Sequence, residues 1–448
     1  MKGAAGVLCG ASIGVSALSA AAWAALVLFR SESWQARTDE YLAAPGGEPW
    51  DVVPRVHAIV PARNEGEVIA QTLPSLVMQS YDALRVTLVD DRSDDGTAEA
   101  AYEAVRGLPV AGRFELVLAE PLRAGWTGKL GALESGIRSA IAGGAVPDFW
   151  LLTDADIRHA PGNVAALVKK ARSEDLELVS LMAHLRCASR WDALLIPAFV
   201  FFFQKLYPFG WSNDPLRQTA AAAGGCVLIS AAALERIGGL AAIRDRLIDD
   251  CALAAEVKRN GGGTWIGLSK RVRSVRRYET LEATWSMVKR TAFTQLDHSY
   301  PRLAAAVAGM ALLYVVPPLA TAAGALGGNG WLAATGLSAW LSMGGAYLPV
   351  VRAYDRPAAA AFALPLAAAL FTGMTVASAW DYARKRGASW KGRTYRAGGS
   401  AEEASDAAFD GAQGAERAEA HSPSGARAAQ HRNGKCRSGQ FTIIVDRT

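Results

Sequence analysis

Long apolar runs occupy both ends of the chain. Residues 3–29 carry no charge, and a helix of that length can cross the roughly 30 Å hydrocarbon core of a bilayer. We expect an uncleaved membrane anchor over 1–30; the small residues near Ala20 leave a cleavable signal peptide as the alternative. Three further apolar segments lie at about 304–326, 331–351 and 358–380. They predict C-terminal membrane segments within 303–381.

A different pattern begins at Val56, where short apolar runs alternate with stretches of helical periodicity. Helices are expected over 97–106 and 129–142. Four runs have the length of strands: HAIV (57–60), RVTLVD (85–90), FELVLAE (114–120) and FWLLTD (149–154). The alternation predicts an α/β domain with a Rossmann-like, mostly parallel sheet. In such sheets, ligands bind beyond the carboxyl ends of the strands.

The remaining boundaries follow from composition. Segment 31–55 is polar and contains several prolines and glycines, which is typical of a linker. We place the folded domain at 56–302, a basic juxtamembrane segment at 382–396 and a tail at 397–448. The tail is rich in Ala, Gly, Ser and Glu without periodicity, so we expect it to be disordered.

The charges near the C-terminal segments conflict with a simple count of crossings. If the folded domain is cytoplasmic, three crossings place the basic stretch 383–396 outside. The positive-inside rule places it inside, together with Arg352 and Arg356. One of the three segments is therefore expected to be re-entrant or interfacial, and the sequence leaves open which one.

Composition agrees with a folded domain joined to membrane segments. The chain is 51% hydrophobic and 20% charged, which is too apolar for an ordinary soluble enzyme and too charged for a pure transporter. A net charge of +5 does not indicate nucleic acid as a partner. The five cysteines form no CxxC pair, which argues against a zinc site or disulfide framework and fits a reducing compartment.

Two acidic motifs follow predicted strands. In LVDDRSDDGT (88–97), Asp91 stands at a strand end, where it can accept hydrogen bonds from a ribose or a base. The alternative is an ordinary strand-end turn, with Ser93 or Asp94 as the cap of the helix that follows. In LLTDADI (151–157), Asp154 and Asp156 are two residues apart and face the same way on an extended chain. Such a pair suits a divalent cation that holds a diphosphate, although a polar strand end gives the same pattern.

A third acidic pair, Asp249 and Asp250, opens a predicted helix that ends near Gly261. At a helix start the two carboxylates can act as caps favoured by the helix dipole. At the mouth of the sheet, either can instead be a general base that takes a proton from an attacking hydroxyl. The residues alone leave both interpretations open.

Two loops add chemistry suited to phosphate. Pro61, Arg63 and Glu65 follow the first strand, and Arg63 either meets phosphate or pairs with Glu67. Lys129 stands between glycines at a helix start in GWTGKLGAL, where backbone N–H groups and an ammonium suit phosphate. The spacing does not match a P-loop, which argues against an NTPase.

The order of these motifs is more specific than any one of them. PARNE, VDDRSDDGT, a GK loop, DAD and a later DD helix resemble glycosyltransferase family 2. Within it, the chain is most similar to the hopene-associated glycosyltransferase group, through GWTGK, the aromatic stretch after residue 190, TAFTQL (291–296) and WKGRTY (390–395). The resemblance covers about residues 50–396. It implies a GT-A fold, inversion at the anomeric carbon, and Mg²⁺ or Mn²⁺ as cofactor.

The resemblance also implies roles for individual residues. Asp250 is the base, with Asp249 beside it, and the departing group is expected to be UDP. The implied donor and metal ligands are Pro61, Glu65 and Asp91 at the nucleoside, Lys129 near the nucleotide, Asp154 near the ribose or the metal, and Asp156 on the metal. The Q/R-x-x-R-W segment of processive synthases is absent from KRTAFTQLDHS (289–299), which argues against polysaccharide synthesis. Arg276, Arg277 and Arg290 are candidates for holding the pyrophosphate.

Other segments suggest a lipid acceptor. The aromatic stretch 191–211 is read as an interfacial helix, with a buried core helix as the alternative. Gly224 and Gly225 either allow close approach of a sugar or shape a turn. The basic run 270–277 suits diphosphate, anionic headgroups or solvent.

The leading hypothesis is an enzyme that transfers a sugar, with inversion, from a nucleotide sugar to a membrane lipid, with hopanoid-related lipids among the candidates. We expect it at the inner membrane of a bacterium, with its catalytic domain in the cytoplasm. A polyprenyl-phosphate sugar transferase is the nearest alternative. A non-catalytic membrane protein that binds nucleotide sugars is another, and a transporter is disfavoured because the apolar segments show no inverted repeat.

Overall fold

The computed structural model describes residues 2–29, 52–109, 112–144 and 146–384, and three short strands at 388–390, 393–395 and 401–403. Most of the predicted linker (31–55) lies outside the described residues. So does the predicted tail (397–448), except for its strand β11 (Ala401–Glu403). This strand pairs with β10 (Arg393–Tyr395), which in turn pairs with β9 (Ala388–Trp390), in a small antiparallel sheet.

An eight-stranded sheet forms the centre of the region from residue 56 to residue 274. Its order is β3-β2-β1-β4-β7-β6-β8-β5. The strands are β1 (Val56–Ala62), β2 (Leu84–Asp90), β3 (Phe114–Leu118), β4 (Phe149–Thr153), β5 (Ile157–His159), β6 (Leu178–His184), β7 (Cys226–Ser230) and β8 (Thr264–Ser274). The four strands predicted first are present and pair in parallel. β7 is antiparallel to both of its neighbours and β5 is antiparallel to β8, so the sheet is mixed but mostly parallel.

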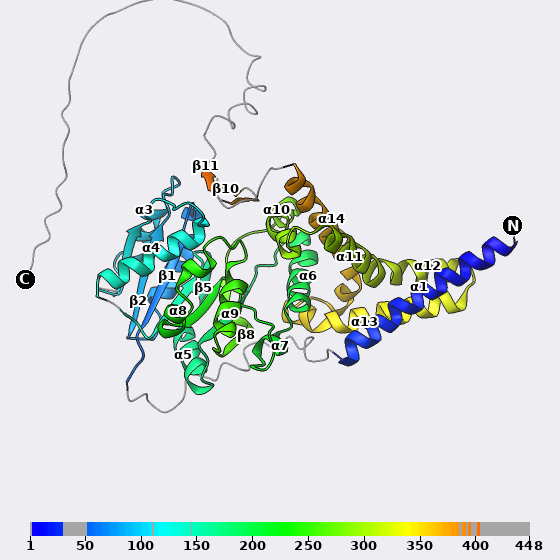
Figure 1. Cartoon of the computed structure of the whole chain (residues 1–448), viewed down its shortest axis with the longest axis horizontal. Helices are drawn as coiled ribbons and strands as arrows, with labels where there is room; N and C mark the ends of the chain where they lie inside the picture. Colours follow the sequence, from blue (N-terminus) through cyan, green and yellow to red (C-terminus); the bar gives the residue numbers. More distant parts are fainter. Residues whose placement is uncertain are drawn as a thin grey trace, which may run out of the picture. The chain divides into compact units, whose positions relative to one another are not determined.

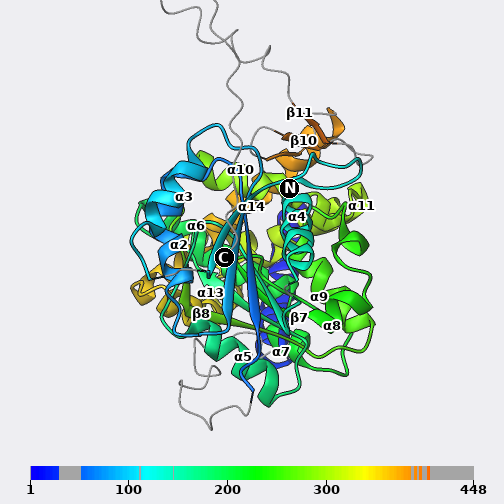
Figure 2. The ribbon, with the colours of Figure 1, turned by 90° about the vertical axis from the view of Figure 1, so that its left-hand side faces the viewer.

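Helices cover both faces of this sheet, as the end-on view shows (Figure 2). Along β1, alternate residues face opposite ways: Ala58 and Val60 belong to one core, while Ile59 belongs to the other. The first core contains side chains of α2 (Gly66–Val77), α3 (Thr97–Val105) and α5 (Asn163–Ser173). The second contains side chains of α4 (Gly128–Ala142), α8 (Ala231–Arg236), the 3₁₀ turn Leu240–Ile243 and α9 (Asp249–Arg259). Burial on both faces explains why these strands are almost continuously apolar.

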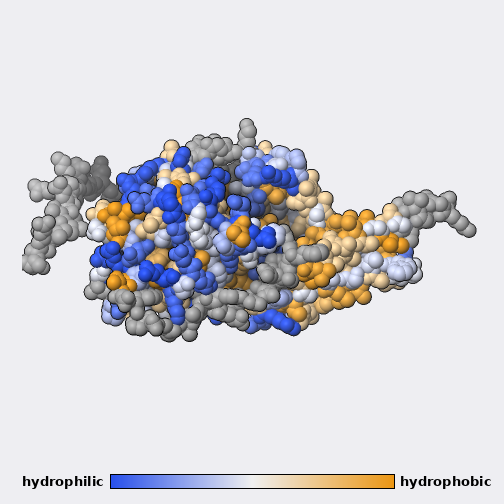
Figure 3. Space-filling model, turned by 60° about the horizontal axis from the view of Figure 1, so that its bottom comes forward, coloured by the Kyte–Doolittle hydropathy of each residue, from blue (hydrophilic) through white to orange (hydrophobic). Residues whose placement is uncertain are grey.

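The apolar segments at both ends of the chain form helices that pack on one another. They are α1 (Lys2–Phe29), α11 (Tyr300–Met310), a π-helical turn (Ala311–Val315), α12 (Val316–Leu326), α13 (Gly330–Ala353), a 3₁₀ turn (Ala358–Ala363) and α14 (Leu364–Ala383). Among the described residues, three stretches are long and apolar enough to cross a membrane: Gly10–Leu28, Tyr300–Leu326 and Ala358–Ala383. α13 packs against both α1 and α12 (Figure 1). Figure 3 shows the hydrophobic surface of this bundle beside the hydrophilic surface of the sheet domain.

Two helices join the sheet domain to the bundle: α6 (Arg190–Leu206) and α10 (Leu281–Ala292), the latter followed by a 3₁₀ turn (Thr294–Leu296). The short helix α7 (Phe209–Asn213) packs on β8. Phe201 of α6 packs against Tyr347 of α13, and Phe202 packs against Phe371 of α14. Much of the aromatic stretch 191–211 is thus used in contacts with other helices. Trp191 and Leu206, at the two ends of α6, are its exposed large apolar side chains. An interfacial role for α6 stays a prediction.

Candidate active site

A cleft of roughly 420 Å³ opens beyond the carboxyl ends of β1 and β4. The sheet rule predicts a ligand site at this edge. Residues from several separate stretches line the cleft: Pro61, Glu65, Thr127, Lys129, Asp154, Ala155, Asp156, Arg246, Leu247, Asp249, Arg276, Tyr278, Ala283, Ser286, Met287, Arg290 and Thr291. Six of the eight residues predicted for the site are among them. A smaller cavity adjoins it and shares Pro61, Lys129, Asp154 and Asp249.

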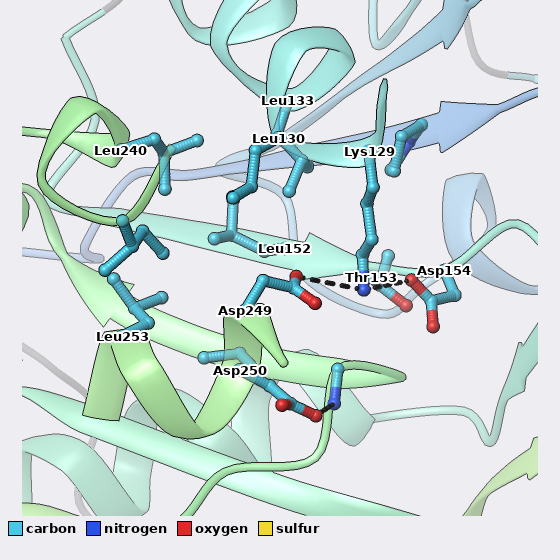
Figure 4. Close-up of a pocket in the computed structure, with 14 residues that line it drawn as sticks. Lys129, Leu130, Leu133, Leu152, Thr153, Asp154, Leu240, Asp249, Asp250 and Leu253 are labelled. Carbon is cyan, nitrogen blue, oxygen red and sulfur yellow. Dashed lines mark hydrogen bonds and ion pairs between the residues drawn. The ribbon is translucent and has the colours of Figure 1, made fainter. Parts of the chain in front are cut away.

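Lys129 lies between two of the acidic motifs (Figure 4). Its ammonium nitrogen is 2.9 Å from Oδ1 of Asp154 and 3.2 Å from Oδ2 of Asp249. Thr127 caps α4 by accepting a hydrogen bond from the backbone N–H of Leu130, which fixes Lys129 in the first turn. Burial alone would lower the pKa of Lys129, but the carboxylates of Asp154 and Asp249 outweigh burial and raise it. Lys129 therefore stays charged and holds the two acidic motifs together.

Asp250 faces the smaller cavity, one residue beyond Asp249 at the start of α9. The backbone N–H of Gly224 donates a hydrogen bond to its Oδ2 at 2.7 Å, and that of Cys251 donates to its Oδ1 at 2.7 Å. Burial and the neighbouring charge of Asp249 raise the pKa of Asp250 to about 6, against the opposing effects of Lys129 and these two hydrogen bonds. A carboxylate with a pKa near neutrality is suited to general-base chemistry.

Gly224 makes room for this arrangement. A Cβ atom at this position would lie 2.7 Å from Nζ of Lys129 and 3.4 Å from Oδ2 of Asp250. Any side chain would therefore displace the lysine. Gly224 and Gly225 form the turn before β7, which confirms one of the two expectations for these glycines. The space that the absent side chain of Gly224 leaves is filled by Lys129, a protein group.

Asp154 and Asp156 both line the cleft, but the predicted reason is wrong. β4 ends at Thr153, and residues 154–156 form a turn before β5 rather than an extended strand. Ser274 donates a hydrogen bond to Oδ2 of Asp156 at 2.6 Å. Burial is the main cause of a raised pKa at Asp154, with the nearby charge of Lys129 acting against it.

Arg276 links the DAD motif to the loop after the first strand. Its guanidinium lies 3.4 Å from Oδ2 of Asp156 and donates to both carboxylate oxygens of Glu65 at 2.7 Å. Glu65 is almost fully buried, so this pair neutralises a carboxylate at the cleft wall. Pro61, at the end of β1, borders both cavities.

Asp91 is placed differently from the other predicted residues. Its side chain is buried and it is not among the residues that line either cavity. Arg63 donates a hydrogen bond to the Asp91 carbonyl at 2.7 Å, a contact that neither of the two expectations for this arginine included. Helix α3 begins after Gly96, and Asp95 accepts a hydrogen bond from the Thr97 N–H, so neither Ser93 nor Asp94 caps it.

The sequence signals missed part of the cleft. Arg246 and Tyr278 line the cleft and are not predicted from the sequence, unlike Arg276 and Arg290, the candidates for pyrophosphate. Ser274, which donates to Asp156 from outside the lining, is not predicted either. The residues that α10 contributes to the wall of the cleft recur at helical spacing: Ala283, Ser286, Met287 and Arg290. A mixed polar stripe of this kind is a usable signal, but it does not indicate that the helix faces a sheet edge. The third basic candidate, Arg277, has a 67% exposed side chain and lies 3.8 Å from Glu279.

The acidic residues fit a divalent cation only as a partial ligand set. Within the described residues, no group of three or more His, Cys, Asp or Glu side chains is arranged to hold a metal. Asp154 and Asp156 offer carboxylate oxygens into the same cleft. Mg²⁺ commonly binds to one or two carboxylates and completes its shell with substrate phosphates and water. The residues present therefore fit a cation that arrives with a diphosphate.

Comparison with solved structures finds glycosyltransferases that share little sequence with this chain. One is a mannosyltransferase from Pyrobaculum calidifontis in complex with GDP-Man and Mn²⁺, at 21% identity and a TM-score of 0.42, covering 82% of this chain and 98% of that one. Another is mannosyl-3-phosphoglycerate synthase from Rubrobacter xylanophilus, at 17% identity and a TM-score of 0.36, covering 58% and 81%. No curated protein matches the chain.

The family comparison covers the region that builds the cleft. The model of glycosyltransferase-like family 2 matches residues 54–294, more than half of the chain. This stretch begins before β1 and ends after α10, and so includes the whole sheet and both walls of the cleft. The GT-A fold expected from the sequence is therefore present, and the chain belongs to glycosyltransferase-like family 2.

Proposed function

We propose that this protein transfers a sugar, with inversion, from a nucleotide sugar to a lipid at the membrane surface. One observation carries the proposal: Asp250, with a pKa of about 6, stands beside Lys129 and Asp249 next to a cleft large enough for a ligand. The donor is expected to be a UDP-sugar, as the sequence resemblance implies. The nucleotide end of the donor is assigned to the cleft wall that contains Pro61 and Glu65.

The proposed reaction is a single displacement. The carboxylate of Asp250 takes the proton of an acceptor hydroxyl as that oxygen attacks the anomeric carbon. The new carbon–oxygen bond forms while the bond from the anomeric carbon to the diphosphate oxygen breaks. The electron pair of that bond leaves with the nucleoside diphosphate. Lys129 holds the carboxylates around the reacting centre in place.

Other groups bind the donor's negative charge. Arg290 extends from α10 into the lining of the cleft and is assigned to the diphosphate. Asp154 and Asp156 would hold Mg²⁺ or Mn²⁺, with Asp156 as the main ligand. When bound, the cation would neutralise charge on the departing diphosphate.

The lipid acceptor is proposed from the helices that surround the cleft. α10 forms one wall of the cleft and packs on α14, a helix apolar enough to enter a membrane. A lipid held by the membrane would thus reach the cleft without leaving the bilayer surface. We place the protein at the inner membrane of a bacterium, in several passes, with the cleft on the cytoplasmic side. Hopanoid lipids and polyprenyl phosphates are the two acceptor classes to compare.

The test is donor hydrolysis by the full-length protein in detergent. A panel of nucleotide sugars is supplied with Mg²⁺, with Mn²⁺ or with EDTA, and released nucleoside diphosphate is measured for the parent chain and Asp250→Asn. The proposal expects cation-dependent release from one donor and a loss of about 10²-fold or more in the variant. Donor binding without release in either chain would favour the non-catalytic alternative. Each lipid class is then added to find which one accepts the sugar.

A further inference from the structure

We propose that α14 lies along the membrane surface, on the side of the catalytic cleft, and does not cross the bilayer. Its length and composition alone would allow a crossing. The contacts on either side of the segment decide otherwise: the chain just before the 3₁₀ turn that leads into α14 is held by the sheet domain, and the last turn of α14 is held by a helix that lines the cleft. The partner of its outer face is the lipid bilayer at headgroup depth.

The chain leading into α14 is attached to the sheet. Tyr354 stacks on His184 at the end of β6, with ring centroids 4.3 Å apart. The next residue, Asp355, lies 3.4 Å from the ammonium of Lys270 in β8. Arg356 then donates a hydrogen bond to the carbonyl of Cys187. Three consecutive residues thus fix the start of this segment beside the edge of the catalytic sheet.

The other end of α14 is attached to α10 and the turn that follows it. Asp381 lies 2.6 Å from the ammonium of Lys289. Ser378 accepts a hydrogen bond from the backbone N–H of Phe293 at 3.1 Å. Tyr382 stacks on His298 with ring centroids 4.4 Å apart. Since Arg290, on the same helix as Lys289, lines the cleft, this end also lies on the catalytic side.

A crossing would separate these two attachments. The helix of 20 residues is about 30 Å long, which matches the thickness of the hydrocarbon core. If α14 spanned the bilayer, one end would be on the far side, away from the sheet or away from α10. Both β8 and α10 lead into the same cleft, through Arg276 and Arg290, so they cannot lie on opposite sides. Figure 1 shows α14 beside α6 and α10, at the base of the bundle of α1, α12 and α13.

The other two apolar segments can enter the membrane and return without α14. Tyr300–Leu326 is long and apolar enough to cross by itself, whereas α13 is not among the three such stretches and would cross packed against α12 and α1. No residue from 303 to 351 is charged. α12 and α13 form a tight hairpin, in which a Cβ on Gly324 would collide with the backbone of Ala333 and one on Gly336 would lie 2.6 Å from the backbone nitrogen of Thr321. Close approach at small residues is typical of helices that pack in a membrane. At the tip, Leu326 and Trp331 are 90% and 77% exposed.

The outer face of α14, together with the 3₁₀ turn before it, is apolar from end to end. The exposed side chains Phe362, Leu366, Val376 and Trp380 recur at helical spacing. The opposite face packs on α10, α6, α11 and the π-helical turn Ala311–Val315. Arg384 lies over the ring of Trp380, 4.5 Å from its centroid. An aromatic ring paired with a cation at one end of an apolar stripe is suited to headgroup depth. We assign this stripe to lipid because it continues the apolar surface of the bundle.

This placement removes the conflict in the charge pattern. The hairpin returns the chain to the catalytic side at Arg352, and α14 keeps it there. The basic stretch 383–396 is then on the same side as the catalytic domain, as the positive-inside rule requires. The segment that does not cross is thus the third one, which the sequence could not identify.

Side-specific labelling of introduced cysteines tests the proposal in the full-length chain. Three exposed positions are compared with the parent chain, whose own cysteines set the background: Glu99→Cys on α3, Trp331→Cys at the hairpin tip and Ala383→Cys at the end of α14. Intact and permeabilised cells are treated with a maleimide that cannot cross membranes. We expect Ala383→Cys and Glu99→Cys to give the same result: both react with the maleimide in intact cells, or both react only after permeabilisation. The opposite behaviour of these two positions would overturn the proposal.

A depth measurement provides the second test. Nitroxide labels on Phe362→Cys, Leu366→Cys and Val376→Cys are compared in lipid nanodiscs through their collisions with oxygen and with a polar nickel complex. A helix in the membrane plane gives the three labels the same depth. A crossing helix gives depths that differ by about 20 Å between the first label and the last. Neither measurement depends on turnover, so a failure here is distinct from a failure of the proposed transferase activity.

Discussion

The ammonium nitrogen of Lys129 lies 2.9 Å from Oδ1 of Asp154, and this ion pair joins the start of α4 to the end of β4. The same ammonium reaches Asp249 on α9. We predict that Lys129→Gln lowers turnover about 10²-fold, because the carboxylates that Lys129 holds would shift and a misplacement of about 1 Å near a reacting centre can cost that much. The melting temperature should also fall, because three carboxylates are left close together without their cation. Turnover, donor affinity and thermal unfolding are the measurements.

A matched surface change serves as the control for Lys129. Arg106 pairs with Glu103 on α3, where both side chains are more than two-thirds exposed. Arg106→Gln removes one positive charge and should leave turnover and melting temperature close to those of the parent. If Lys129→Gln behaved like Arg106→Gln, the lysine would have no part in holding the site.

Gly224 offers a way to move Lys129 without removing its charge. We predict that Gly224→Ala reduces turnover about tenfold or more, because its Cβ would lie 2.7 Å from Nζ of the lysine. Gly143→Ala is the matched control, since its Cβ would meet neighbours only at 3.5 Å and beyond. Steady-state turnover of the two variants is compared. Equal activities would show that the lysine can occupy another position at no cost.

The pH dependence of turnover follows from Asp250. Burial raises its pKa to about 6, and a base must be deprotonated to act. We therefore predict that kcat/KM falls about tenfold per pH unit below roughly pH 6 and is level above it until another group titrates. Asp250→Glu, which keeps a carboxylate, should retain a measurable acid limb, whereas Asp250→Asn should lose about 10²-fold or more of the activity together with the acid limb. An acid limb near pH 4 would contradict the assignment of this residue.

The same pKa shift predicts an effect on stability. Because the folded state binds this proton more tightly than the unfolded chain, the stability contributed by Asp250 is present below about pH 4 and is lost as the pH rises through about 6. Asp250→Asn removes this loss. Its melting temperature should therefore exceed that of the parent at about pH 7.5 and approach the parent value near pH 4. A variant that melts lower than the parent at the higher pH would indicate that the two backbone hydrogen bonds to Asp250 outweigh the burial of its charge.

Local sequence signals were sufficient to predict the part of the site that contains Asp154, Asp156 and Lys129. Asp154, Asp156 and Lys129 each stand next to a strand end or a helix start that hydrophobic periodicity identifies. The carboxyl ends of parallel strands meet at one edge, so the positions of these residues in the sequence predict that they lie together. The relative geometry of Asp154 and Asp156 could not be predicted in the same way, because a tight turn replaces the extended chain that their spacing suggests.

The rest of the site depends on long-range packing. Arg276 reaches Glu65 across 211 residues of sequence, and no local pattern near either residue indicates the pair. β7 and β5 enter the sheet antiparallel, a choice set by their connections rather than by their composition. The wall formed by α10 likewise depends on its contact with α14, and α14 looks like a membrane span when its sequence is read alone.

The cation requirement is predicted to depend on Asp156 more than on its neighbour Glu65. Both carboxylates contact Arg276, but only Asp156 belongs to the proposed metal ligands. Asp156→Asn should raise the Mn²⁺ concentration at half-maximal activity about tenfold or more. Glu65→Gln, which disturbs the same arginine, should change the KM for the donor and leave the Mn²⁺ requirement unaltered. The measurement is activity against Mn²⁺ at saturating donor, and equal shifts in the two variants would contradict the metal assignment.

We predict that the ion pair between Lys289 of α10 and Asp381 of α14 fixes the position of α10, and with it the wall of the cleft. Their charged atoms are 2.6 Å apart and both side chains are partly exposed, and the next residue, Arg290, lines the cleft. Lys289→Ala and Asp381→Ala should each lower the free energy of unfolding by about 1 kcal/mol and reduce turnover several-fold. The double variant should lose little more than either single one, because all three lack the same pair. The same set of single and double variants at the exposed pair of Arg106 and Glu103 is the control. Additive losses at Lys289 and Asp381 would show that the two residues act independently and that α14 does not position the wall of the cleft.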